Sequence, residues 1–421
     1  MKMTVTEKIL ARAAGVKEAK AGEILTVNLD WVMTNDATTH ISIDIYNRKV
    51  KNRRIANPGH TIFIIDHNVP SESVKTTHIQ NLMRQFAREN GIILHDGEGV
   101  CHQLLMEKYI SPGEVIIAAD SHTCSAGALG AFGSGVGSTD FLAAMVTGKT
   151  WLLVPETLRF NFTGQFPRGV YARDLILRII GDIKADGAAY RCMEFGGPAI
   201  QNLTLDDRMT LCNLSVEAGA KNGIVAPDER TRAYLKAQRR AYNEALFFTS
   251  DEGCSYLKIY DYNLSELEPA VVAPHFVDNY MAIGKIEKEK IVIDEAFIGS
   301  CNNGRIEELR VAAIILRNKK IASKVRLLIV PASQEVFIQA AREGLLEIFL
   351  DCGATVLNPN CSVCWGACQG VIGDNEVLIS TGTRNFKGRA GSSNSFVYLA
   401  SAATVAASSL AGRIVDPRNN D

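Results

Sequence analysis

The stretch KIVIDEAFIGSCNNGR (290–305) runs from β-branched and aromatic residues into a turn of glycine and asparagine that carries Cys301. A second stretch, NPNCSVCWG (358–366), holds Cys361 and Cys364 in a C-x-x-C pattern among turn-forming residues. Three thiolates from two such turns can bind a soft metal centre and leave one coordination position open, as a catalytic metal requires. The spacing suits an iron–sulfur cluster with one iron free for substrate; Cys352 and Cys368 are alternative ligands.

The composition is typical of a globular protein with two or three domains. The 421 residues are 47% hydrophobic and 22% charged, and the formal net charge is −1. Because no basic run is present, we expect no nucleic-acid partner. The N-terminus lacks the apolar core of a secretory signal, and ten cysteines follow no disulfide framework, which predicts the cytoplasm.

One uncharged segment, 390–412, has about the length that spans a bilayer. Its many serines and small alanines favour a tightly packed helix instead, so we expect no membrane association.

Short β-branched runs alternate along the chain with segments of helical pattern. The expected strands are TIFIIDH (61–67), EVIIAAD (114–120), KIVIDEAFIG (290–299) and RLLIVPA (326–332). The expected helices include one capped by Thr4 and Glu7 and ended by Gly15, and the ranges 78–91, 141–154 and 342–353. This alternation predicts an α/β fold with largely parallel sheets, whose functional residues follow the carboxyl ends of strands.

Two segments suggest domain boundaries. FTGQFPRGV (162–170) is interpreted as the entry to a second unit, and the polar stretch 265–279 as a linker before a third. The expected domains are therefore 1–160, with the Asp/His strand ends, 161–285, and 286–421, with the cluster cysteines.

Aspartate and histidine gather where expected strands end. Asp66 and His67 close one strand, Asp120, Ser121 and His122 close another, and His102 lies in GVCHQ between them. Carboxylate–imidazole pairing sets a histidine tautomer and tunes a proton donor near neutral pH. A lone histidine would be a structural residue more often than not, but two such clusters indicate function.

Three other types of site have less support in the sequence. A zinc hydrolase has little support, because no H-x-x-x-H pattern is present. A cysteine protease is disfavoured, because Cys101–His102 are sequence neighbours and catalytic dyads usually come from separate segments. The glycine-rich run GALGAFGSGVGSTD (127–140) departs from the dinucleotide fingerprint and follows a loop, so a close-packed turn beside the active site is expected instead.

The loop STGTRNFKGRAGS (380–392) carries Arg384 and Arg389 on either side of a glycine. Arginine binds carboxylates through paired hydrogen bonds, so this loop suits a di- or tricarboxylate. Beside a cluster site, that interpretation is preferred to a solvated basic loop.

Taken together, these motifs resemble the aconitase superfamily of hydro-lyases, and within it the large subunits of the isopropylmalate and homoaconitate type. The resemblance covers nearly the whole chain and rests on DSHT (120–123), GSCNNGR (299–305), the C-x-x-C before Trp365, RNFKGR (384–389) and the closing DPR. It implies the superfamily's fold: three α/β/α domains around a central cluster.

The resemblance also implies the site. It implies an oxygen-sensitive [4Fe–4S] cluster on three thiolates: Cys301, Cys361 and Cys364. It implies three proton-handling pairs, the first assisting departure of hydroxide: His67 with Asp66, His102 with Asp120, and His122 with Glu217. Substrate contacts or braces are implied for a further set: Asn35, Ser121, Asn213, Arg384 and Arg389.

The implied reaction is dehydration of a hydroxy-diacid to an unsaturated acid, usually with rehydration at the neighbouring carbon. The first choice of substrate is 3-isopropylmalate of leucine biosynthesis; homoaconitate, dimethylmalate and methylmalate are alternatives. Asn35 and Thr383 depart from the expected pattern, which motivates the hypothesis of a shifted substrate preference. An iron–sulfur sensor or RNA-binding regulator on the same fold is the alternative of another class, and a zinc site is a third possibility.

The resemblance further implies a partner. Full-length aconitases carry a C-terminal swivelling domain that supplies the serine base, and this sequence ends at Asp421 without one. A separate small subunit, and hence a hetero-oligomer, is therefore expected.

Overall fold

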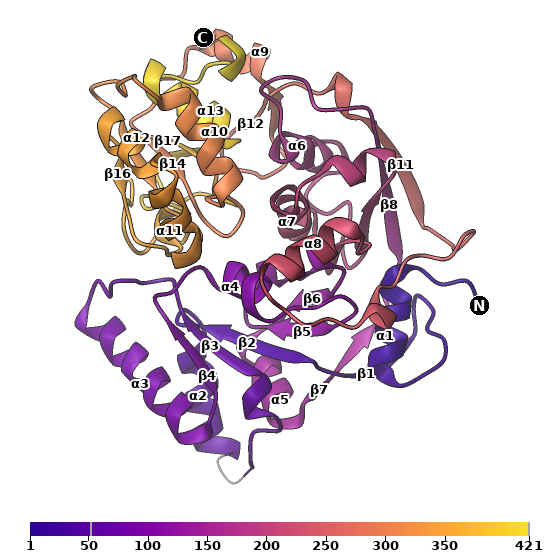
Figure 1. Ribbon diagram of the computed structural model, residues 1–421. Helices are drawn as coiled ribbons and strands as arrows, with labels where there is room; N and C mark the ends of the chain where they lie inside the picture. Colours follow the sequence, from indigo (N-terminus) through magenta and orange to yellow (C-terminus); the bar gives the residue numbers. More distant parts are fainter. Residues whose placement is uncertain (51–52, 420–421) are drawn as a thin grey trace.

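The computed structural model describes residues 1–50 and 53–419, which form an α/β protein in which parallel sheets alternate with helices (Figure 1). The helices, in chain order, are α1 Val5–Ala14, α2 Thr39–Ile45, α3 Val74–Asn90, α4 Cys101–Lys108, α5 Ser138–Thr147, α6 Ala172–Ile183, α7 Leu205–Leu214, α8 Glu229–Ala237, α9 Ile283–Ile286, α10 Ile306–Leu316, α11 Gln334–Arg342, α12 Leu345–Cys352 and α13 Ala402–Ala411. No helix within these described ranges is long and apolar enough to span a membrane.

The first sheet is parallel throughout and has the order β4-β3-β2-β5-β6. Its strands are β2 Trp31–Asn35, β3 Thr61–Ile65, β4 Ile93–Asp96, β5 Val115–Ala118 and β6 Phe132–Gly135. In β3 every residue is buried, as expected of a strand covered by helices on both faces. A two-stranded antiparallel ribbon lies at one side: β1 Ile24–Asn28 and β7 Lys149–Leu153.

Two further sheets complete the fold. The second has the parallel order β10-β9-β8-β11: β8 Thr157–Thr163, β9 Cys192–Gly196, β10 Asn222–Val225 and β11 Lys258–Asn263. The third has the order β13-β12-β18-β17-β14-β15-β16 and is parallel except around β12: β12 Ala270–Val272, β13 Tyr280–Ala282, β14 Glu295–Ile298, β15 Arg326–Ile329, β16 Thr355–Val356, β17 Val377–Ser380 and β18 Phe396–Ala400. Helix α4 lies where the regions built on the three sheets meet (Figure 1).

The α/β fold class is confirmed, and several local expectations are too. Thr4 and Glu7 form the capping box of α1, and Gly15 ends that helix in a left-handed conformation. The helix expected over 78–91 is the C-terminal part of α3, which ends at Gly91.

Other local expectations were wrong. The helix predicted over 141–154 ends at Thr147, because Gly148 has φ +68° and the next residues pair with β1 as strand β7. The uncharged segment 390–412 is not a single helix: Phe396–Ala400 is strand β18, paired with β17, and only Ala402–Ala411 is the tightly packed helix α13. The strand predicted over 290–299 is confined to β14.

The glycine-rich run is not a simple loop, since its middle residues form β6 and lead into α5. Close packing is nevertheless its physical requirement: a Cβ on Gly133 would lie 2.2 Å from the carbonyl oxygen of Thr123.

The division into three domains stays a prediction, but the sheets show how strands are shared. Strand β8 crosses the boundary proposed at 160, and the segment 265–279, expected to be a linker, contributes β12 to the third sheet.

Candidate active site

The three cysteines of the sequence motifs line one pocket of about 180 Å³ between the first and third sheets. Cys301 follows β14, and Cys361 and Cys364 lie at a single 3₁₀ turn, Ser362–Cys364, after β16. The pocket is lined by the following residues: Asn35, Ala37, Thr38, His67, Cys101, His102, Ala119, Asp120, Ser121, His122, Cys301, Cys361, Cys364, Trp365, Thr383, Arg384 and Arg389. Of the predicted site residues, only Asp66, Asn213 and Glu217 are absent from this lining, and each contacts a residue that is in it.

The turn that carries Cys301 is held by unusual backbone conformations and one buried arginine. Ser300 and Gly304 have φ of +80° and +81°. The guanidinium of Arg305 donates hydrogen bonds to the carbonyl oxygens of Cys301 (2.8 Å) and Asn302 (2.9 Å). The turn therefore has its carbonyl groups satisfied inside the protein and presents its thiol to the pocket.

His67 is paired with Asp66 at the carboxyl end of β3. Nδ1 of His67 lies 2.7 Å from Asp66 Oδ1, and the other carboxylate oxygen of Asp66 accepts from the backbone N–H of Cys101 at 2.6 Å. Asp36, which sequence reasoning missed, accepts from the backbone N–H groups of Asp66, His67 and Asn68 at 2.9–3.1 Å. This buried carboxylate fixes the loop that carries the histidine.

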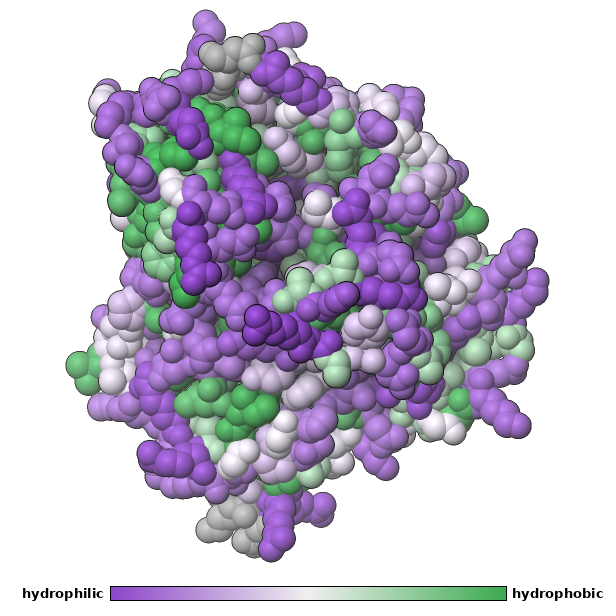
Figure 2. Space-filling view, viewed as in Figure 1, coloured by the Kyte–Doolittle hydropathy of each residue, from purple (hydrophilic) through white to green (hydrophobic). Residues whose placement is uncertain are grey.

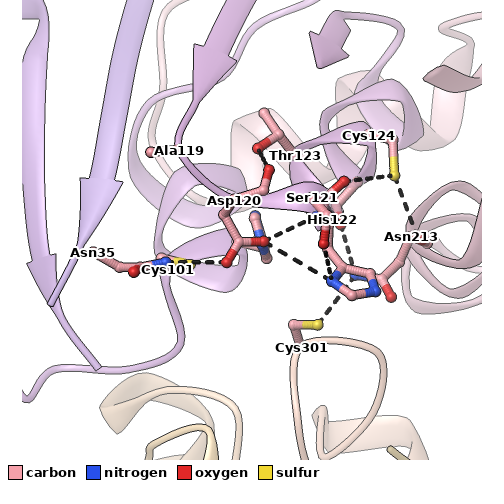
Figure 3. Close-up of polar contacts among 12 residues, drawn as sticks. Asn35, Cys101, Ala119, Asp120, Ser121, His122, Thr123, Cys124, Asn213 and Cys301 are labelled. Atoms are coloured by element: carbon pink, nitrogen blue, oxygen red, sulfur yellow. Dashed lines mark hydrogen bonds and ion pairs between the residues drawn. The ribbon is translucent and has the colours of Figure 1, made fainter. Parts of the chain in front are cut away.

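Asp120 is the centre of a second group of contacts (Figure 3). Its Oδ1 accepts from Nε2 of His102 at 2.7 Å and from the backbone N–H of His122 at 2.9 Å. Its Oδ2 accepts from Nδ2 of Asn35 at 3.0 Å, so this departure from the expected pattern directly contacts the proton-handling pair. Nδ1 of His102 is buried and has no hydrogen-bond partner among the described residues.

The third carboxylate–histidine pair joins His122, which follows β5 of the first sheet, to Glu217, which follows α7. Nε2 of His122 lies 2.9 Å from Glu217 Oε1, and Nε of Arg384 donates to both oxygens of the same carboxylate at 2.8 and 3.1 Å. Arg384 also donates to the hydroxyl of Ser121 at 3.0 Å. Arg384 is thus engaged with protein groups and braces the site.

Arg389 differs from Arg384 in its contacts. Its Nε is buried without a protein partner among the described residues, while its side chain lines the pocket. A buried N–H of a guanidinium without an acceptor is costly, so this position fits a ligand carboxylate.

The charges in the pocket divide between neutral and ionised groups. Burial would raise the pKa of Asp120, but its ion pair with His102 holds that pKa well below the usual value. Burial lowers the pKa of His122, the hydrogen bond that His122 donates to Glu217 opposes this, and the charge of Arg384 lowers the pKa further. Burial would raise the pKa of Glu217, but its contacts with His122 and Arg384 keep that pKa below the usual value. A neutral His122 must then carry its proton on Nε2, toward the ionised Glu217.

Asn213 ties the second part of the chain to the cluster turn. Its Nδ2 lies 2.8 Å from Ser125 Oγ and 3.4 Å from the sulfur of Cys301. Figure 3 shows Asn213 and Cys301 close together behind and below His122. Its Oδ1 accepts from Asn302, and Asn302 in turn accepts from the wholly buried Arg173. Arg173 has no motif around it in the sequence, so only the tertiary packing could reveal it.

The donor set fits a soft metal cluster. Burial would raise the pKa of the Cys364 thiol, but the charge of Arg389 and the backbone N–H of Thr383 lower it. Burial raises the pKa of Cys361 to about 12, so binding there has to displace a proton. Among the described residues, the groups whose ligand atoms converge within 4.8 Å are Asp66, His67 and Cys361, and Cys101, His102 and Asp120. The three cysteines do not converge in this way, so together they match a multi-iron cluster better than one zinc ion.

Comparison with known proteins identifies the same family across the chain. The model of the Aconitase family (aconitate hydratase) matches residues 7–412. The 3-isopropylmalate dehydratase large subunit of Elusimicrobium minutum is 47% identical over 99% of both chains, and a probable methanogen homoaconitase large subunit of Methanothermobacter thermautotrophicus is 44% identical over 99% of this chain and 98% of its own.

A solved structure agrees at the level of the fold. The holo-form of Thermococcus kodakaraensis aconitase X superposes with a TM-score of 0.51 at 13% identity, covering 86% of this chain and 84% of that one. With the family match, the full-length relatives and the geometry of the pocket, the chain belongs to the aconitase family, whose hydro-lyases depend on a [4Fe–4S] cluster.

Proposed function

We propose that this chain is the cluster-bearing large subunit of a 3-isopropylmalate dehydratase. The observation that carries the proposal is the pocket itself: three cysteines, three carboxylate–histidine pairs and Arg389, whose Nε has no partner among the described residues, line or adjoin one cavity. Relatives named 3-isopropylmalate dehydratase large subunit, 43–47% identical over their full length, support this substrate. A homoaconitase is the second candidate, favoured by the relative of that name at 44% identity.

In this proposal Cys301, Cys361 and Cys364 hold the cluster. When bound, it supplies a Lewis acid for the hydroxyl and one carboxylate of the substrate. His67, oriented by Asp66, gives a proton to the departing hydroxide, a role that its 2.7 Å hydrogen bond supports.

The other groups bind and orient. His102 and His122 hold or accept protons through the carboxylates behind them, and Arg389 binds the second carboxylate of the diacid. Asn35, which bonds Asp120, contributes to the choice of diacid. If Asn35→His leaves the relative rates on every candidate acid unchanged, that part of the proposal is wrong.

We also propose that the proton on carbon is removed by a serine of a separate small subunit. The large-subunit names of the relatives support a partner. The test is to reconstitute the chain anaerobically and assay it with 3-isopropylmalate, homoaconitate and dimethylmalate, with and without its small subunit. We expect little turnover by the chain alone and full turnover of 3-isopropylmalate by the complex. Full activity of the chain alone would contradict the division of roles, and turnover of homoaconitate only would replace the substrate.

A further inference from the structure

A buried hydrogen-bond network connects the Cys301 turn to helix α4. Its members are Arg305, Gln103, Glu107 and Ser333. Arg305, besides holding the Cys301 and Asn302 carbonyl groups, donates from Nε to Oε1 of Gln103 at 3.1 Å. Nε2 of Gln103 donates to Oε1 of Glu107 at 2.8 Å, and Ser333 donates its hydroxyl proton to the same oxygen at 2.7 Å. The four residues of this network are between 0% and 6% exposed.

The hydrogen bonds from Arg305 through Gln103 to Glu107 run in one direction, and Ser333 donates to Glu107 from the other side. A guanidinium can only donate, so the group of Gln103 that faces Arg305 must be its carbonyl oxygen. The amide nitrogen of Gln103 then has to find an acceptor on its other side. Glu107 provides that acceptor, so the carboxylate determines which way the amide of Gln103 points.

The network lies between the residues of α4 that line the pocket and the turn that carries Cys301. Helix α4 begins with Cys101 and His102, and Gln103 is the next residue. The start of the helix is fixed by Asp66 through the backbone N–H of Cys101, and two residues later the side chain of Gln103 is fixed by Arg305. The same arginine holds the carbonyl group of the first cluster ligand.

We propose that Gln103 and Glu107 are positioning residues that set the place of Cys301 relative to His102, acting through Arg305. This inference rests on the cluster of the family and on the residues of the large subunit alone. It needs neither the substrate nor the small subunit named under the proposed function, so the two can fail separately.

The test exploits the direction of the bonds. At pH 8, above the pKa of about 7 that burial gives Glu107, Q103E turns the amide of residue 103 into a second carboxylate that faces Glu107, so two acceptors meet without a donor. Adding E107Q reverses the donor between the two side chains: Arg305 donates to the new carboxylate, and the new amide nitrogen of residue 107 donates to its other oxygen. The second N–H of that amide faces Ser333, whose hydroxyl oxygen then accepts instead of donating. The contacts between Arg305, residue 103 and residue 107 are then satisfied again.

The measurements are made on the anaerobically reconstituted chain. They are the iron and sulfide retained, the half-life of the visible absorbance in air, and the electron paramagnetic resonance spectrum of the reduced cluster. We expect Q103E to shorten the half-life about tenfold, as for one buried hydrogen bond lost, and to shift the spectrum. Q103E/E107Q should restore both to within about twofold, and E107Q alone should change them little, because its amide oxygen still accepts from Gln103.

A matched control lies on the surface. Gln85 and Glu89 make the same Gln-to-Glu contact, four residues apart on α3, at 2.8 Å and exposed. Q85E and Q85E/E89Q should leave the half-life and the spectrum unchanged. Thermal unfolding of the cluster-free variants separates local positioning from global stability.

The inference is overturned if Q103E keeps the normal half-life and spectrum, or if the double variant folds and shows no recovery. If Q103E fails to fold, the double variant decides: a folded double variant with the normal cluster supports the inference, and an unfolded one overturns it.

Discussion

At the scale of single residues, Asp120 is the group on which the most contacts of the site converge. Asp120→Asn removes the charge that pairs with His102 and leaves an amide that cannot accept from both His102 and His122 while Asn35 also donates. We expect kcat of the complex to fall by about 10²–10⁴-fold, the usual contribution of a proton-handling group. Steady-state kinetics checks this, and the iron content shows whether the cluster is retained. A variant that lost activity only in proportion to lost iron would assign Asp120 a structural role.

Asp36 is a residue whose importance is structural and local. Asp36→Ala removes the acceptor of three backbone N–H groups, and buried donors without a partner each cost about 1–3 kcal/mol. We expect the free energy of unfolding in urea to fall by about 3 kcal/mol. Asp36→Asn is the graded control, because its remaining carbonyl oxygen can still accept from Asp66 and His67. Equal losses in the two variants would contradict this account.

Residues of the site differ in how far the sequence predicts them. Asp66 and His67, and Asp120 with His122, stand directly after strands, and parallel strands bring such residues to one edge by geometry alone. Asp36 also follows a strand, but nothing in its neighbourhood indicates that the loop at 66–68 will wrap around it. Arg305 is visible in its motif, yet its partner Gln103 lies 202 positions away, and no local pattern records that contact.

At the scale of elements, the turn between β14 and α10 combines a strained conformation with close packing. Gly304 has φ +81°, and a Cβ there would lie 2.5 Å from the carbonyl oxygen of Val330. Gly304→Ala should therefore displace the turn and reduce the iron bound after reconstitution. Gly344→Ala is the matched control: its φ is +72° and no atom lies within 4 Å of the new Cβ.

The two variants share the cost of a left-handed alanine, about 1 kcal/mol, so the difference between them isolates the steric clash. Iron content and the urea midpoint are the measurements. Equal losses of iron in both variants would show that backbone conformation alone matters at this turn.

Elements also show where sequence patterns stop being informative. The residues of β7 have an apolar pattern that continues from α5, and a helix over 141–154 is locally reasonable. Gly148 ends the helix, and pairing with β1, more than 120 residues earlier in the chain, makes the following residues a strand. Such long-range pairing overrides local propensity.

At the scale of the whole molecule, the site exists only because separate sheets direct their carboxyl ends toward one pocket. β2, β3 and β5 lead to Asn35, to Asp66 and His67, and to Asp120 and His122, while β14 and β17 lead to Cys301 and Arg384. The face in Figure 2 is largely hydrophilic, with hydrophobic side chains in small groups, as expected when the apolar residues are packed between such sheets. The strands could be predicted one at a time, but their convergence follows from topology.

The molecule also buries several carboxyl groups away from the cluster, and these predict how stability depends on pH. Burial raises the pKa of Glu107, Glu114 and Asp174 to about 7 in each case. In the unfolded chain these groups have pKa values near 4, so they hold no proton between pH 6 and 8. The folded chain binds protons at pH 6 that it releases by pH 8, so its stability must fall as the pH rises.

We expect a loss of about 1 kcal/mol for each of these carboxyls between pH 6 and 8. His122 opposes the trend, because its lowered pKa makes the unfolded chain the better proton binder near pH 6. It is one group against these three carboxyls, and burial also raises the pKa of Glu295 to about 7 and of Glu308 to about 8, which adds to the fall. Urea unfolding of the cluster-free chain at pH 6, 7 and 8 measures the slope. Glu114→Gln should flatten it, since one amide oxygen can still accept from Ser111 and Trp31 while the proton is no longer exchanged. Stability that rises from pH 6 to 8 would mean that these carboxyls are ionised in the folded protein, with water or a counter-ion beside them.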